Sequence, residues 1–187
     1  MNLKNLLSEK KSAILKRWFE VILETYSADT SSFLKRQKNR FANPVGYTIS
    51  QGVDGLFEEL LQGSNSDRIS LFLDNIIRIR AIQDLSPSQA IGFIFLLKKV
   101  IRKELAKEIR EDGLSEELLT LESRIDDLAL LSFDIYMKCR EKIYELKANE
   151  VRNRTFGLLK RANLLYELKE QETDLEDGNI DNLYETR

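Results

Sequence analysis

Apolar side chains recur every three or four residues along most of the chain, which is the spacing of one face of an α-helix. The first such run covers residues 3–26, and it predicts one amphipathic helix. Asp29 is suited to cap a short second helix, because its carboxylate can accept backbone N–H groups. A basic cluster of Lys35, Arg36, Lys38 and Arg40 follows, and we interpret it as a solvated helix end.

The segment after residue 42 carries signals for both ends of a helix. Asn43 is a favourable N-cap residue, Pro44 suits the first turn, and Gly63 can end the helix in the left-handed conformation. Glycines at positions 46, 52 and 55 lower the helix propensity between these ends. We therefore expect a neighbouring helix or a ligand to approach this helix closely.

The next apolar run contains an arginine on its apolar side. Helical periodicity places Arg80 with the apolar residues and Arg78 on the other side. A buried guanidinium requires polar partners, and the candidates are Asp84, Asp54 and Glu58. Structural anchoring is the commoner role for such an arginine.

A strong helix start follows at Ser86, which can cap the helix while Pro87 occupies its first position and Gln89 completes a capping box. From Ala90 to Leu97 the helix is apolar on every side, which predicts burial on every side. We expect it to continue until Gly113.

The longest predicted helix starts at Ser115 and carries two apolar stripes, which suggests two packing partners. A helix of this length exceeds what one small domain needs, so the sequence predicts a homodimer that pairs along it. The candidate dimer seam consists of Leu121, Ile125, Leu128, Ile135 and Ile143.

A further stripe, in a shifted phase, continues through residues 148–169 and forms a candidate effector surface of Val151, Leu158 and Leu165. Whether residues 115–168 form one helix or two is open at this point. Residues 170–187 are acidic and aperiodic, so we expect a disordered tail. The predicted organisation is a helical domain over 1–147, a helical extension over 148–169, and that tail.

Composition supports an all-α fold, with only 8 Gly and 2 Pro in 187 residues. The formal net charge of −2 gives no long-range field toward phosphate backbones, so nucleic acid is not an expected partner. The chain has neither a signal-peptide core nor an apolar run of bilayer length, so we expect a cytoplasmic protein without a membrane partner.

The chain contains no histidine, which removes the usual general base and the commonest zinc and haem ligand. Haem ligation would fall to Met137, Cys139 or a tyrosine, and none has a distinctive context. The adjacent carboxylates in Glu58-Glu59 and similar pairs point about 100° apart on a helix, so they do not converge on a metal. We therefore predict neither catalytic residues nor a cofactor or metal, and expect no enzyme.

Three segments resemble the N-terminal sensor domains of RsbR-type proteins, the RsbT co-antagonists of the bacterial stressosome. They are Asn43-Pro44-Val45-Gly46-Tyr47, the stretch from Ile77 to Ala90 and the stretch from Phe93 to Lys98. The resemblance implies a globin-like domain without haem that dimerises through long helices and signals through its last helix. Relatives usually continue into a STAS domain, whereas we expect this chain to be a stand-alone member.

The leading functional hypothesis is a non-catalytic sensor or regulatory domain of the stress-response type, which binds a ligand or a protein partner. The alternative is a structural adaptor or assembly factor for an energy-metabolism complex, since short relatives resemble proteins encoded among sulfate-reduction genes. A cavity near Trp18, Phe57, Arg80 and Phe95 would favour the sensor. The candidate pocket comprises Trp18, Phe57, Arg80, Gln83, Asp84, Ser86, Gln89 and Phe95.

Overall fold

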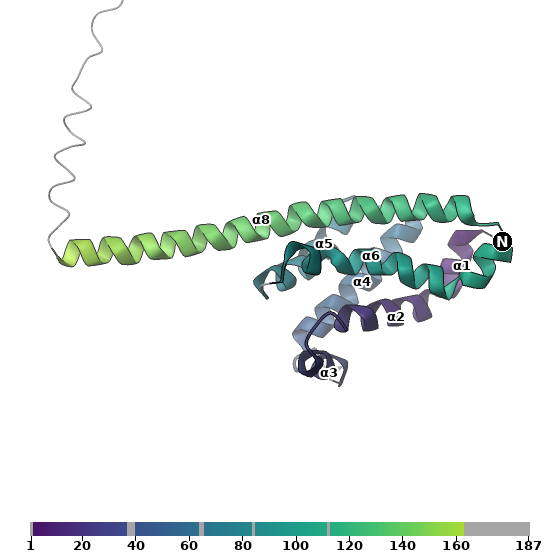
Figure 1. Cartoon of the computed structure of the whole chain (residues 1–187), viewed down its shortest axis with the longest axis horizontal. Helices are drawn as coiled ribbons and strands as arrows, with labels where there is room; N and C mark the ends of the chain where they lie inside the picture. The colour runs from purple at the N-terminus through teal and green to yellow at the C-terminus, as the bar shows by residue number, and fades with distance from the viewer. Residues whose placement is uncertain (1, 37–39, 64–65, 84, 112, 163–187) are drawn as a thin grey trace, which may run out of the picture. The chain divides into compact units, whose positions relative to one another are not determined.

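The computed structural model describes the chain except for residues 1, 37–39, 64–65, 84, 112 and 163–187. Within the described part there are eight α-helices and no strand (Figure 1). The helices are α1 (Leu3–Glu9), α2 (Lys11–Leu23), α3 (Ala28–Arg36), α4 (Pro44–Gln62), α5 (Ser66–Ile82), α6 (Pro87–Glu104), α7 (Ala106–Glu111) and α8 (Ser115–Arg161). The all-α prediction is thus confirmed.

The first 26 residues form two helices where the sequence predicted one. Lys10 lies between α1 and α2 with a backbone outside the helical region, at φ −91° and ψ 8°. Its side chain donates to the Glu104 carbonyl oxygen at 2.9 Å and pairs with the Glu108 carboxylate at 2.5 Å. These partners lie 94 and 98 residues away along the chain, so no local sequence pattern predicts the break.

α3 starts earlier than expected, because Asp29 lies inside its first turn. The Ser27 hydroxyl accepts from the Thr30 backbone N–H at 3.4 Å, so Ser27 occupies the position that had been given to Asp29. The expected ends of α4 are confirmed: the Asn43 side chain accepts from the Gly46 N–H at 2.8 Å, and Gly63 has φ +95°.

α4 packs against α5 at two of its glycines. A Cβ atom on Gly52 would lie 2.6 Å from Ile76 Cδ1, and one on Gly55 would lie 2.4 Å from Phe72 Cζ. Both distances are below any ordinary contact between carbon atoms. The close approach expected at these glycines is therefore made by a neighbouring helix.

α6 begins with the predicted capping box, in which Ser86 and Gln89 each bond the other's backbone. The expectation that it is buried on every side is wrong, because Phe95 is 43% exposed. The expected continuation to Gly113 is also wrong, since α6 ends at Glu104 and the separate short helix α7 follows. Leu105, at this break, is itself fully buried in the core.

One core cluster joins side chains of α1, α2, α4, α5, α6 and α8. α2 packs against α4 and α6, and α4 packs against α5. The Trp18 indole, on α2, donates to the Phe93 carbonyl oxygen of α6 at 2.8 Å, and the two rings stack with centroids 6.3 Å apart. This contact ties the second and sixth helices together at the centre of the domain.

α8 is a single helix from Ser115 to Arg161, which settles the question that the sequence left open over this stretch. The chain divides into two compact units, Met1–Glu141 and Lys142–Arg187. The last buried side chain of α8 among the described residues is that of Tyr136, whose hydroxyl donates to the Leu85 carbonyl oxygen at 2.8 Å. The acidic tail predicted over 170–187 lies outside the described residues.

Candidate functional site

Arg80 is the largest charged side chain in the core, with no exposed surface. It lies on the inner side of α5, and its guanidinium donates to four acceptors. Its Nε bonds the Ala90 carbonyl oxygen at 2.9 Å and one Nη2 bond reaches the Gln89 carbonyl oxygen at 2.8 Å. The hydroxyls of Tyr26 and Thr25 complete the set, each at 3.1 Å. Arg80 therefore clamps the chain after α2 to the first turn of α6.

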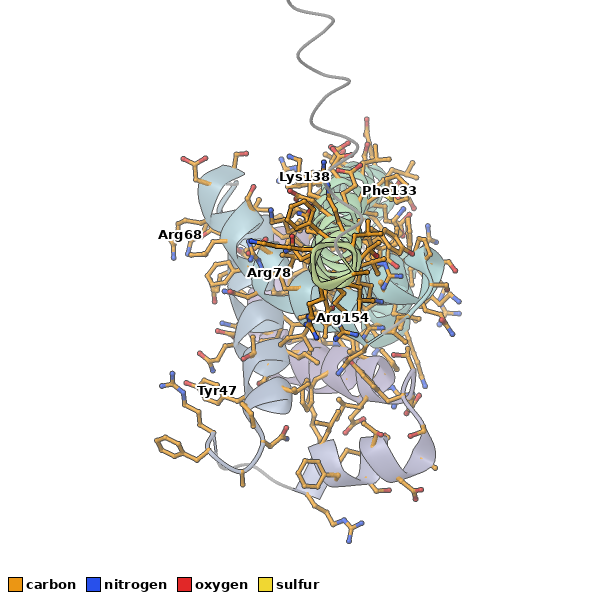
Figure 2. All side chains as sticks on the ribbon, turned by 90° about the vertical axis from the view of Figure 1, so that its left-hand side faces the viewer. Tyr47, Arg68, Arg78, Phe133, Lys138 and Arg154 are labelled. Atoms are coloured by element: carbon orange, nitrogen blue, oxygen red, sulfur yellow. The ribbon has the colours of Figure 1, made fainter. Side chains whose placement is uncertain are left out.

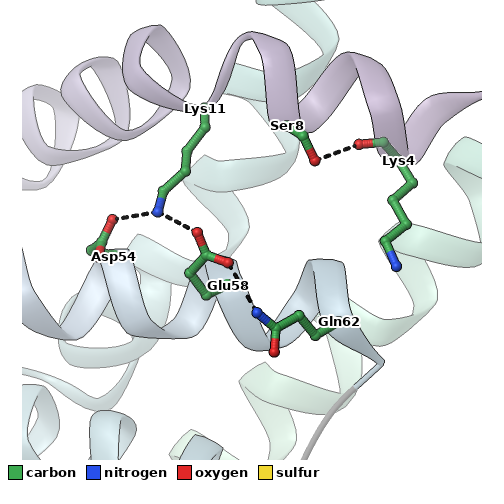
Figure 3. Close-up of polar contacts among 6 residues, drawn as sticks. All are labelled: Lys4, Ser8, Lys11, Asp54, Glu58 and Gln62. Carbon is green, nitrogen blue, oxygen red and sulfur yellow. Dashed lines mark hydrogen bonds and ion pairs between the residues drawn. The ribbon is translucent and has the colours of Figure 1, made fainter.

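Neither of the α4 carboxylates proposed as partners of Arg80 forms an ion pair with it. Asp54 and Glu58 both pair with Lys11 of α2, with Asp54 at 3.0 Å (Figure 3). Asp84 lies outside the described residues. Within the described part of the chain, every hydrogen-bond acceptor of Arg80 is a neutral oxygen. The prediction of a carboxylate partner on α4 is thus wrong, because Asp54 and Glu58 pair with α2.

Burial shapes the electrostatics around this clamp. It lowers the pKa of the Arg80 guanidinium, because removal from water disfavours the charged form. It raises the pKa of the Tyr26 hydroxyl for the same reason, since the charged form is the phenolate. Two aromatic rings compensate part of the buried charge: the guanidinium carbon lies 5.1 Å from the Tyr26 centroid and 5.6 Å from that of Phe93.

The other candidate pocket residues divide between core and surface. Trp18 and Phe57 are buried in the core cluster. Gln83, Ser86 and Gln89 are exposed in the loop and first turn that precede and open α6, and Phe95 points to the outside of that helix. The structure thus brings Trp18 and Arg80 to a common neighbour, Phe93, and leaves Phe95 apart from them.

Two open clefts lie along α8, with volumes of about 230 and 270 Å³. They share Leu60 of α4 and Arg124 of α8, and apolar side chains form much of their walls. Trp18, Phe57, Arg80 and Phe95 line neither of them. These clefts carried no signal in the sequence, because they depend on how the ends of α1, α4 and α5 meet α8.

The residues predicted to form the dimer seam lie mostly inside the domain. Leu121, Ile125 and Leu128 are buried in the core of their own chain, and Ile135 is half-buried against it. These side chains are already covered within one copy, so they do not offer a surface to a second one. Ile143, in the second unit, is half-exposed.

Four exposed apolar residues of α6 and α8 form a different surface. Lys98 pairs with Asp126 at 2.6 Å and Arg102 with Glu122 at 2.5 Å, so the two helices run antiparallel side by side. One turn further along, Phe95 on α6 and Leu130 on α8 are both exposed. Phe133, labelled in Figure 2, and Met137 continue the exposure along α8. We call Phe95, Leu130, Phe133 and Met137 the α6–α8 face.

The predicted effector surface is exposed where the structure describes it. Val151 is 65% exposed and Leu158 is 63% exposed, whereas Leu165 lies outside the described residues. Among the described residues, no group of three or more acidic or cysteine side chains is placed to hold a metal ion. The helices that are described include none with the length and apolar character needed to cross a bilayer.

An all-α domain with exposed apolar helix surfaces of this kind is typical of proteins that act through contacts with other proteins. A family model described as the RsbT co-antagonist protein rsbRD N-terminal domain matches residues 12–151, well over half of the chain. The chain belongs to this family. No curated protein and no solved structure matched it.

Proposed function

We propose that the chain is a non-catalytic regulatory domain of the stressosome type, which works in the cytoplasm as a homodimer and passes its state to a protein partner. Family membership supports the regulatory role, since the family is named for co-antagonists of RsbT. A globin-like arrangement of the helices without haem is part of the proposal, and it rests on the family resemblance together with the all-helical fold.

The observation that carries the dimer is the α6–α8 face. Leu130 and Met137 are seven residues apart on α8 and therefore share one side of it, with Phe133 between them. All three are exposed, as is Phe95 on the neighbouring helix. Contiguous apolar surface on a monomer marks an interface, and a two-fold axis would place this face against its own copy. The buried Leu121, Ile125 and Leu128 then hold α8 onto the domain and leave the side with the α6–α8 face for pairing.

The effector surface of this proposal is the described part of the second unit, and Val151 and Leu158 are among its exposed apolar side chains. A ligand pocket around Arg80 is not included, because Trp18, Phe57 and Phe93 fill the core beside it. The regulatory signal therefore passes through protein contacts in this proposal.

Sedimentation velocity of the full chain at micromolar concentration tests the dimer. We expect the wild-type chain to sediment as a dimer and the Leu130→Asp/Met137→Asp variant as a monomer, because two carboxylates would have to be buried in the interface. Leu71→Asp is the matched control, since Leu71 is 59% exposed on α5 and outside this face. A monomeric wild-type chain, or a dimer that survives both substitutions, would rule the interface out.

A further inference from the structure

Residues 142–161 of α8, called here the basic helix segment, carry an apolar strip on one side of the helix. This strip offers less apolar surface than a helix needs to pair with a second copy of itself. Tyr144, Val151 and Leu158 recur every seven residues and are each more than half exposed. The positions between them along this strip are Ala148 and Thr155, which are small. Two such helices packed together would bury little apolar area at every second layer, so a partner with larger side chains would fill the strip better.

Charge in this segment is strongly one-sided. It contains six basic residues and two acidic ones: Lys142, Lys147, Arg152, Arg154, Lys160 and Arg161 against Glu145 and Glu150. Both acids already pair within the helix, Glu145 with Lys142 at 2.7 Å and Glu150 with Arg154 at 2.5 Å. No other ion pair involves the six cations within the described residues. Among the described residues, the surface of this segment therefore carries an uncompensated positive charge.

Some of these cations flank the apolar strip, where side chains face the flanking residues of a paired helix. Lys147, Arg154 and Arg161 recur every seven residues along one edge of the strip. In a parallel pair of two copies, Lys147 would face Arg152 of the other copy, and in an antiparallel pair the two basic edges would face each other. Both arrangements place like charges together, which disfavours pairing with a second copy.

We propose that the basic helix segment binds an acidic amphipathic helix of another protein, with large apolar side chains against Ala148 and Thr155 and carboxylates beside Lys147, Arg154 and Arg161. This inference rests on the effector role given above to the second unit, and it names the chemistry of the partner. It does not depend on the dimer, which uses residues of the first unit.

The test uses a synthetic helical peptide of three heptads with Leu at both core positions and Glu at both flanking positions. Fluorescence anisotropy measures its binding to the full chain at about 50 mM and 300 mM salt. We expect the acidic peptide to bind the wild-type chain, and its affinity to fall as the salt concentration rises. Its affinity for the Lys147→Glu/Arg154→Glu/Arg161→Glu variant should be about tenfold or more below that for the wild-type chain. A peptide with Lys in place of Glu should not bind.

Lys142→Glu/Lys160→Glu is the matched control, because both lysines lie about 180° around the helix from Val151. This variant should bind the acidic peptide as the wild-type chain does, and circular dichroism should show equal helix content in all variants. Equal binding of both peptides, or unchanged binding by the triple variant, would overturn the proposal. So would acidic-peptide binding that appears only after residues 170–187 are deleted, or ready disulfide cross-linking of two Val151→Cys chains. Sedimentation of the same proteins reports separately on the dimer.

Discussion

The Arg80 side chain is a cation buried in the core, and none of its hydrogen-bond partners among the described residues is acidic. The guanidinium has a planar set of donors, and here four of them meet oxygens from two different parts of the chain. Two of those oxygens are backbone carbonyls in the first turns of α6, and two are hydroxyls just after α2. Arg80 is thus a structural anchor that joins the residues after α2 to the start of α6.

The Tyr26 hydroxyl gives this clamp a dependence on pH. Burial raises the pKa of Tyr26 above its ordinary value of about 10, so the folded chain retains the phenol proton more strongly than the unfolded chain. The resulting stabilisation is fully present below pH 10 and is lost as pH rises through the folded-state pKa.

We therefore predict that Tyr26→Phe reduces the free energy of unfolding at pH 8 by about 1 kcal/mol, because a hydrogen bond to Arg80 is lost. Between pH 9.5 and pH 11 the variant should lose less stability than the wild-type chain. Urea unfolding at these pH values measures both effects. Tyr144→Phe is the control, because Tyr144 is 57% exposed, and equal alkaline losses in Tyr26→Phe and wild type would contradict the prediction.

At the scale of the helix, sequence predicts ends well where the signal is local. Asn43, Gly63 and the Ser86 capping box were identified from residue type and position, and the structure places each at a helix end. The breaks at Lys10 and Leu105 were missed, because neither involves glycine or proline. Lys10 is held by partners near the end of α6, and Leu105 turns into the core, so both breaks come from tertiary contacts.

The glycines of α4 and α6 allow the same substitution to be compared in two surroundings. Gly52→Ala should reduce the free energy of unfolding by about 1–2 kcal/mol, because its Cβ would meet the buried Ile76 side chain. Gly92→Ala should instead increase it by about 0.5–1 kcal/mol, since nothing lies within 4 Å of the added carbon and alanine favours the helix. Urea unfolding of both variants tests this, and effects of the same sign would refute it.

At the scale of the whole chain, every buried side chain among the described residues lies in the first unit. The last buried side chain along the described sequence is that of Tyr136, and the first unit ends at Glu141. In residues 142–161 every side chain is exposed or half-exposed. Residues 142–161 therefore contribute little buried surface.

We predict that a chain ending at Glu141 unfolds within about 0.5 kcal/mol of a chain ending at Arg161, because residues 142–161 bury little surface. Both chains should carry Leu130→Asp and Met137→Asp, so that association does not enter the comparison. Chemical denaturation measures the difference. A loss of several kcal/mol would mean that residues beyond 141 contribute to the core.

Taken alone, the sequence determined the all-α class, both ends of α4, the starts of α6 and α8, the inner position of Arg80 and the family, because each depends on residue type at short spacing. It did not determine which apolar stripe of α8 is covered. Leu121, Ile125 and Leu128 form the more regular stripe and were assigned to a dimer, yet the domain buries them. Periodicity identifies a face that requires a partner, but only the tertiary structure decides whether that partner is the chain's own core or another molecule.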